Sequence, residues 1–123
     1  MWVSCASLFQ RALPVLKWLN KLSHEQETII PVRLVKGAYW DYEIKNAQQL
    51  GLNEYPVFTL KESTDLSYMA CSSFLLSDEC QKFMYPQFAT HNAYTLCMIE
   101  SIGYKKITSY KNYLEWVMFY IIM

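Results

Sequence analysis

Short apolar stretches and longer amphipathic stretches alternate along this chain of 123 residues. In the short stretches apolar side chains recur every second residue, which is the period of a strand, and in the longer ones they recur every third or fourth residue, which is the period of a helix. The patterns predict, in order, a helix over Arg11 to Leu22, a strand over Ile29 to Lys36, a helix over Glu43 to Leu50 ended by Gly51, a helix capped by Thr64 or Asp65, a strand over Pro86 to Asn92, and a helix capped by Asn92 that runs to Gly103. This order indicates βα units and an α/β fold with a parallel sheet.

The first predicted strand carries an arginine among apolar residues. Arg33 shares one face of the strand with Val35 and Gly37, because side chains two apart point the same way. A buried guanidinium is unfavourable unless an anion or several hydrogen-bond acceptors meet it. The strand therefore predicts a binding surface for a flat ligand with polar edges, and an arginine that reaches solvent from an edge strand remains the alternative.

The second predicted strand also ends in polar residues, at Thr90, His91 and Asn92. The carboxyl ends of parallel strands lie at one edge of the sheet, where loops and helix amino termini present free N–H groups to ligands. We therefore expect the two strands to be parallel neighbours, with Arg33 and His91 on the same face or at the same end of the sheet.

The chain has enough hydrophobic residues to form a core, and its charge limits the partners it can attract. Hydrophobic residues make up 53% of the chain, and the formal net charge is zero, so no electrostatic attraction to nucleic acid is expected. One face of the helix after Thr64 is predicted to join the core, through Leu66, Met69, Ala70 and Phe74. The cysteines are interpreted as reduced core residues of an intracellular protein, in preference to a metal site: Cys5, Cys71, Cys80 and Cys97.

Five segments, in order along the chain, resemble the proline dehydrogenase domain found in bacterial proline utilisation A. The resembling segments are Gln10 to Leu16, Arg33 to Asp41, Tyr55 to Thr59, Thr64 to Tyr68 and Tyr85 to Asn92. One such motif is weak evidence, whereas five collinear motifs are specific. The resemblance implies a partial (βα)8 TIM-like barrel that contains only the middle βα units.

The resemblance sets the expected domain bounds at residues 10–103, with residues 1–9 and 104–123 as non-matching ends. Plausible codons for both ends, read in a shifted frame, encode family-like segments, so we interpret the chain as a frameshifted and inactive gene remnant; divergent termini are the alternative. Two or three βα units cannot close a barrel, so the piece is expected to be unstable alone.

The resemblance also implies the chemistry. The family oxidises L-proline to 1-pyrroline-5-carboxylate with FAD and passes the electrons to quinone. This implies a cytoplasmic location, or a peripheral one at the inner face of the cytoplasmic membrane. No transmembrane segment is expected, because the apolar stretch Trp116 to Met123 is too short to span a bilayer. The sequence leaves the oligomeric state open and indicates no metal.

The resemblance assigns two candidate catalytic residues, Arg33 beside the flavin N5 and Tyr39 beside the proline ring. The implied FAD-binding residues are Arg33, Val35, Gly37, Ala38, Trp40, Thr59, Lys61, Thr64, Ala89, Thr90, His91 and Asn92. Plainer structural roles remain open for several of them: Tyr39 and Trp40 as filling of the barrel mouth, and Lys61 as a solvated loop lysine. A non-catalytic interaction module, or another flavin- or phosphate-binding βα protein, is the alternative function.

Overall fold

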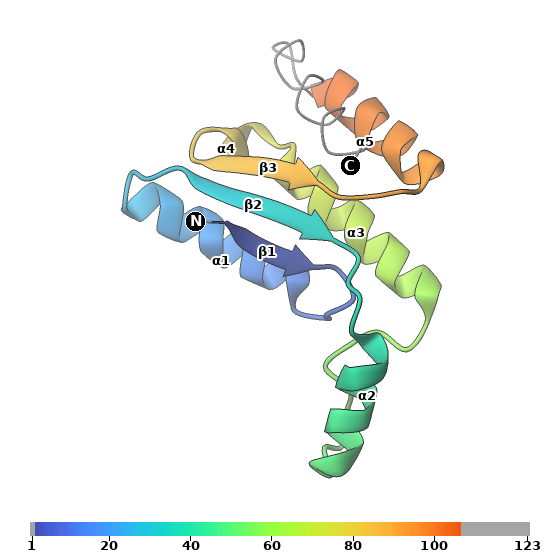
Figure 1. Ribbon diagram of the computed structural model, residues 1–123. Helices are drawn as coiled ribbons and strands as arrows, with labels where there is room; N and C mark the ends of the chain where they lie inside the picture. Colours follow the sequence, from blue (N-terminus) through green and yellow to red (C-terminus); the bar gives the residue numbers. More distant parts are fainter. Residues whose placement is uncertain (1, 107–123) are drawn as a thin grey trace.

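The computed structural model of the chain describes residues 2–106 and contains three parallel strands. The elements follow the order β1 (Val3–Ala6), α1 (Ala12–Glu25), β2 (Ile30–Val35), α2 (Trp40–Gln49), α3 (Lys61–Leu75), α4 (Asp78–Gln81), β3 (Met84–Phe88) and α5 (Ala93–Lys106). The sheet order is β1-β2-β3, and β2 pairs in parallel with both neighbours (Figure 1). The predicted parallel pairing of the two strands is therefore confirmed, with Arg33 opposite Gln87 in the register.

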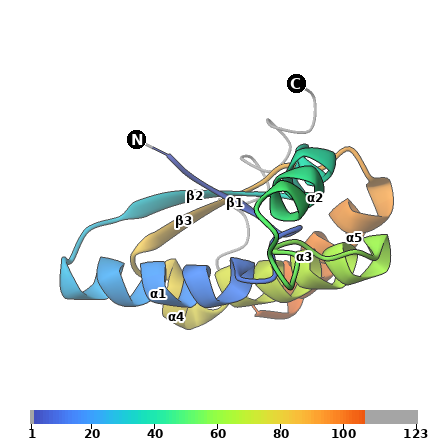
Figure 2. The ribbon, with the colours of Figure 1, turned by 90° about the horizontal axis from the view of Figure 1, so that it is seen from below.

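The molecule has two layers. Helices α1, α3, α4 and α5 cover one face of the sheet, and α2 projects beyond the carboxyl end of β2 (Figure 2). The buried core lies between the sheet and these helices: Val32 and Leu34 of β2 are fully buried, as are Leu16 of α1 and Cys71 and Leu75 of α3. The pleat sends Val32 and Leu34 into this core, so Arg33 and Val35 lie on the opposite face.

The predicted elements are recovered with shifted bounds. Helix α2 begins at Trp40, three residues before the predicted start, and ends at Gln49, close to Gly51, whose φ of +62° is typical of a glycine that follows a helix. Strand β3 begins two residues before Pro86 and ends at Phe88, so residues 89–92 form the following loop. Asn92 caps α5 as predicted, because its Oδ1 accepts a hydrogen bond from the backbone N–H of Thr95 at 3.2 Å.

Two predictions about the helix after residue 60 are wrong in whole or in part, namely its start and its core-facing side. Helix α3 begins at Lys61 rather than after Thr64 or Asp65, and no side chain caps it. Its buried residues are Tyr68, Cys71, Ser72 and Leu75, so the core-facing side is rotated from the predicted one. Of the predicted face, Phe74 packs against the core, whereas Leu66 is 67% exposed. The packing of Tyr68 and Cys71 into the core sets this face.

Cys5, Cys71 and Cys80 are free and buried, as predicted, but Cys97 is exposed. Burial raises the pKa of the Cys5 thiol to about 11, with a smaller contribution from the neighbouring Cys71. Burial likewise raises the pKa of Cys71 and of Cys80. Because the thiolate is the reactive form, these three thiols are protected both by their pKa and by their packing.

We expect a water-soluble maleimide at about pH 7.5 to label Cys97 alone in the folded chain, because only that thiol is accessible, and to label all four cysteines in urea. Mass spectrometry of the labelled protein measures the stoichiometry. Cys97→Ser should remove the native-state labelling, and rapid labelling of Cys5 without urea would contradict the packing of β1 against α1.

Candidate functional site

The carboxyl end of the sheet is held by main-chain contacts between three loops. The backbone N–H groups of Ser7 and Leu8, which follow β1, donate to the carbonyl oxygens of Val35 and Lys36 at 2.8 and 2.9 Å. Leu8 in turn accepts from the N–H of Phe58, at 2.9 Å. The loops after β1, after β2 and before α3 are thus joined, and they form a rigid rim for a site.

A cavity of about 440 Å³ lies at this rim. Its lining contains five of the twelve residues that the sequence predicts for FAD binding, namely Gly37, Trp40, Thr59, Lys61 and Thr64. These residues come from the end of β2, the first turn of α2, the loop before α3 and the first turn of α3. Leu8, Lys36, Phe58, Leu60 and Asp65 complete the lining.

Trp40 is fixed at the cavity by a hydrogen bond. Its indole Nε1–H donates to the carbonyl oxygen of Phe58 at 2.7 Å, and 40% of the residue stays exposed. A partly exposed indole with its N–H satisfied presents a flat apolar surface to a ligand. Tyr39, by contrast, is 75% exposed, lies just before α2 and does not line the cavity.

Two lysines and one carboxylate set the charge of the cavity. The Lys36 ammonium lies 2.6 Å from Asp65 Oδ1, and the Lys61 ammonium lies 3.5 Å from Asp65 Oδ2. The hydrogen bond from Lys36 is the main reason that the pKa of the Asp65 carboxyl is lowered, and Lys61 adds to the effect. These three side chains carry a net charge of +1, which favours an anionic ligand. The sequence reasoning did not identify Lys36 or Asp65, although both lie inside recognised motifs.

Lys36 also approaches an aromatic side chain that links α3 to β3. The Lys36 Nζ atom lies 5.9 Å from the centroid of the Tyr68 ring. The Tyr68 hydroxyl donates to the carbonyl oxygen of Ala89 at 3.2 Å, and the N–H of Ala89 donates to the carbonyl oxygen of Leu34 at 2.9 Å. Through this path the cavity is connected to the segment at residues 89–92.

The remaining predicted residues lie outside the cavity lining. Arg33 and Val35 are half-buried in β2, and Ala38 is exposed. Thr90 is half-buried and accepts a hydrogen bond through its hydroxyl oxygen from the N–H of Asn92 at 3.1 Å. His91 and Asn92 are exposed in the loop between β3 and α5. Because β2 and β3 are parallel, this loop lies at the same end of the sheet as Gly37, which follows β2.

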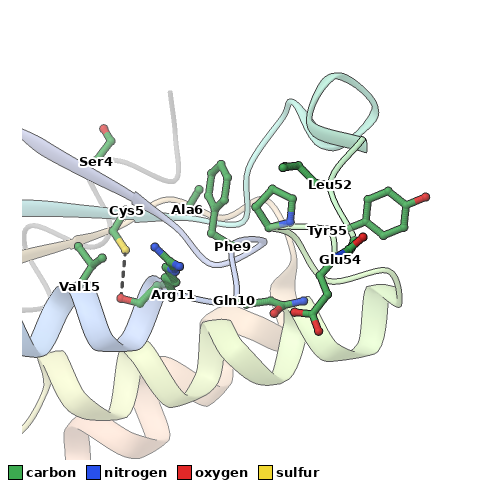
Figure 3. A pocket seen from close by; sticks show the side chains of 13 residues that line it. Ser4, Cys5, Ala6, Phe9, Gln10, Arg11, Val15, Leu52, Glu54 and Tyr55 are labelled. Carbon is green, nitrogen blue, oxygen red and sulfur yellow. Dashed lines mark hydrogen bonds between the residues drawn. The ribbon is translucent and has the colours of Figure 1, made fainter. Parts of the chain in front are cut away.

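A larger cavity, of about 890 Å³, lies beside β1 and the start of α1 (Figure 3). Phe9, Arg11 and Val15 line it on one side, and Leu52, Glu54 and Tyr55 line it on the other. It contains none of the predicted site residues. Because β1 is an edge strand of the described sheet, a hollow at this place is what an incomplete barrel wall would leave. We therefore take the smaller cavity as the candidate site.

Among residues 2–106, no group of three or more His, Cys, Asp or Glu side chains has the arrangement of a metal site. In the same part of the chain, no helix combines the length and the apolar character needed to cross a membrane.

A parallel sheet with helices on one face and a cavity at its carboxyl end is the arrangement of a βα-barrel segment. A family model described as "Proline dehydrogenase" matches residues 8–120, and the chain belongs to this family. The family is flavin-dependent, its members are oxidoreductases of proline catabolism, and the chain is a partial piece of its barrel.

The chain is similar to bifunctional PutA proteins. It is 50% identical over 96 residues to that of Klebsiella aerogenes and 52% identical over 85 residues to that of Rhizobium meliloti, which corresponds to 77% and 69% of this chain. It spans about 7% of the length of these curated relatives.

Solved structures of PutA proteins share the fold. A crystal structure of bifunctional proline utilization A superposes with a TM-score of 0.78 at 44% identity, over 82% of this chain and 10% of that one. The proline utilization A of Bdellovibrio bacteriovorus, inactivated by N-propargylglycine, gives a TM-score of 0.78 at 37% identity, over 83% of this chain and 10% of that one.

Gly37 offers a test of how the rim is built. Its φ is +115°, and a Cβ added there would lie 1.8 Å from Leu8 Cδ2, whereas a Cβ at Gly51, with φ +62°, would meet nothing within 4 Å. We expect Gly37→Ala to destabilise the chain by more than about 2 kcal/mol and Gly51→Ala by about 1 kcal/mol, because only the first must also displace Leu8. Urea unfolding followed by tryptophan fluorescence measures both, and equal losses would show that Leu8 does not constrain the rim.

Proposed function

We propose that this chain carries the FAD-binding part of a proline dehydrogenase, with the 440 Å³ cavity holding the adenosine and diphosphate part of the cofactor. The observation that carries the proposal is the gathering of Gly37, Trp40, Thr59, Lys61 and Thr64, from the two stretches 37–40 and 59–64, at one cavity. Ligand pockets are typically lined by apolar and aromatic side chains with a few polar groups among them, and this lining combines Trp40 with Lys61 and Thr64.

The residues fit a dinucleotide diphosphate. Lys36 and Lys61 supply two ammonium groups against one Asp65 carboxylate, and the first turn of α3, with no side-chain cap, has backbone N–H groups that favour an anion. Thr64 adds a hydroxyl on the same turn, and the Trp40 ring offers an apolar surface for a base. Lys61, for which a solvated lysine was the alternative, lies at the start of α3 and lines the cavity with 81% of its side chain exposed.

Arg33 has a different role in this proposal. When bound, FAD would accept a hydride from the carbon beside the nitrogen of L-proline. A guanidinium fixed near N5 would favour the negative charge that the reduced ring carries. Val35, Ala89, Thr90, His91 and Asn92 would contact the middle of the cofactor, and Tyr39 would border the substrate. L-proline and a quinone acceptor are the corresponding proposed partners.

The diphosphate part of the proposal predicts a selective loss. We expect Lys61→Ala to weaken binding of FAD to the 123-residue chain by about fivefold and to leave riboflavin binding unchanged, because only FAD carries phosphates. Quenching of flavin fluorescence measures both ligands. Lys45→Ala, on the exposed side of α2, is the matched control, and equal losses for FAD and riboflavin would contradict the placement of the diphosphate.

We further propose that the 123-residue polypeptide, expressed by itself, has no proline-dependent turnover. Within residues 2–106 the sheet is open and has three strands, so this part of the chain gives the substrate no enclosing wall. Orientation in a water-excluded site supplies much of enzymatic rate enhancement. The assay is reduction of a quinone-analogue dye by L-proline with added FAD, on protein shown by circular dichroism to be folded. Robust turnover would overturn the interpretation as an inactive remnant, and a folded chain that remains colourless with FAD would favour the interaction-module alternative.

A further inference from the structure

A row of polar side chains crosses the sheet on the face opposite the helices. Ser4, Arg33 and Gln87 are successive register partners in β1, β2 and β3, so their side chains point to the same face. Val32 and Leu34, one position away on either side, point into the core. Gln87 belongs to none of the roles proposed above.

The contact between Arg33 and Gln87 fixes the orientation of the glutamine amide. Arg33 Nε–H donates to Gln87 Oε1 at 3.4 Å. A guanidinium has only donors, so the amide must present its oxygen to the arginine and turn its NH₂ group away. The Trp2 ring lies on the guanidinium, with its centroid 5.4 Å from Arg33 Cζ. One amide and one aromatic ring thus restrict the cation in two directions.

For the stability of the fold alone, a glutamine at position 87 is unfavourable. It is 6% exposed, and its Nε2 atom is buried with no hydrogen-bond partner among residues 2–106. A buried donor without an acceptor destabilises a fold, so an apolar side chain of the same size would serve the packing at least as well. The oxygen that Gln87 presents to Arg33 is therefore the property that needs a glutamine.

We infer that Gln87 is a positioning residue for Arg33, which it holds at the face where the proposed function places the flavin ring. The inference rests on that proposed function for its chemical consequence. Without the amide oxygen, the Arg33 Nε–H loses this acceptor, and the guanidinium charge is held less tightly at its place beside N5. A glutamate at the same position would hold the guanidinium but neutralise its charge.

The positioning can be measured without any cofactor. The chain contains two arginines, Arg33 and the exposed Arg11, so the side-chain Nε–H signals of ¹⁵N-arginine-labelled protein are assigned by one Arg33→Lys variant. We expect slow hydrogen exchange at Arg33 in the native chain, fast exchange in Gln87→Met and slow exchange in Gln87→Glu. Arg11 should exchange rapidly in all three and is the internal control.

The chemical consequence is measured with sulfite, whose sulfur lone pair adds to N5 of oxidised flavin and leaves a negative charge on the ring. We expect Gln87→Met to weaken sulfite binding to the FAD-loaded chain about tenfold, as expected for a misplaced charge-assisted contact, and Gln87→Glu to weaken it further. FAD affinity should stay within about twofold, because the diphosphate contacts are untouched. Bleaching of the flavin absorption band reports the adduct, and Gln26→Met, exposed at the end of α1, is the matched control.

The outcomes separate the two proposals. Unchanged Arg33 exchange in Gln87→Met overturns the positioning role, and so does an unchanged sulfite affinity in a chain that binds FAD. A lower urea midpoint for Gln87→Met with no selective effect at Arg33 assigns the glutamine a structural role and also overturns the inference. Failure of the folded native chain to bind FAD overturns the proposed function, and the exchange measurement then still decides the positioning of Arg33.

Discussion

The alternation of side chains along β2 is the constraint from which the rest of the structure follows. Val32 and Leu34 are fully buried against the helical layer, and this burial fixes which face of the strand Arg33 must take. A slip of one residue in register would expose both apolar side chains and place the guanidinium in the core, at a free-energy difference of several kcal/mol. Because β2 pairs with both other strands, the same register also sets Gln87 opposite Arg33 and brings the carboxyl ends together.

The candidate site depends on that register through its loops. Once β1 and β2 are paired, Ser7 and Leu8 continue the ladder by donating to Val35 and Lys36, and Leu8 fills the space where a side chain at Gly37 would point. The glycine is therefore required by packing within the protein, independently of any approach by a cofactor. Lys36, which follows β2 directly, is then directed toward Asp65 on α3, so the strand and the helix amino terminus share one charged contact.

Much of this arrangement was predictable from sequence because short-range patterns determine it. The period of two in residues 30–35 predicts the strand, and Asn92 predicts the start of α5 through its capping hydrogen bond. The start of α3 was not predictable in this way, because no side chain caps it and Leu60, which precedes it, is 64% exposed. Tertiary packing of Tyr68 and Cys71 against the sheet selects the buried face there, at the cost of exposing Leu66. The exposure of Cys97 likewise follows from the orientation of α5, which the local sequence does not specify.

The candidate site likewise has one part that was predicted from the sequence and one part that was not. The family resemblance implied that Gly37, Trp40, Thr59, Lys61 and Thr64 bind FAD, and all five line one cavity. The Lys36–Asp65 pair depends on the packing of α3 beside β2, and the Arg33–Gln87 contact depends on strand register, so no single motif contains either of them. Gln87 lies in the middle of a strand, where sequence reasoning expects a residue chosen for packing. Its buried nitrogen has no hydrogen-bond partner within the described part of the chain, so packing alone does not explain the choice. At such a buried polar residue a functional constraint can be separated from a structural one. An apolar replacement removes the unpaired polar group from the protein interior, so only the lost function remains to be measured.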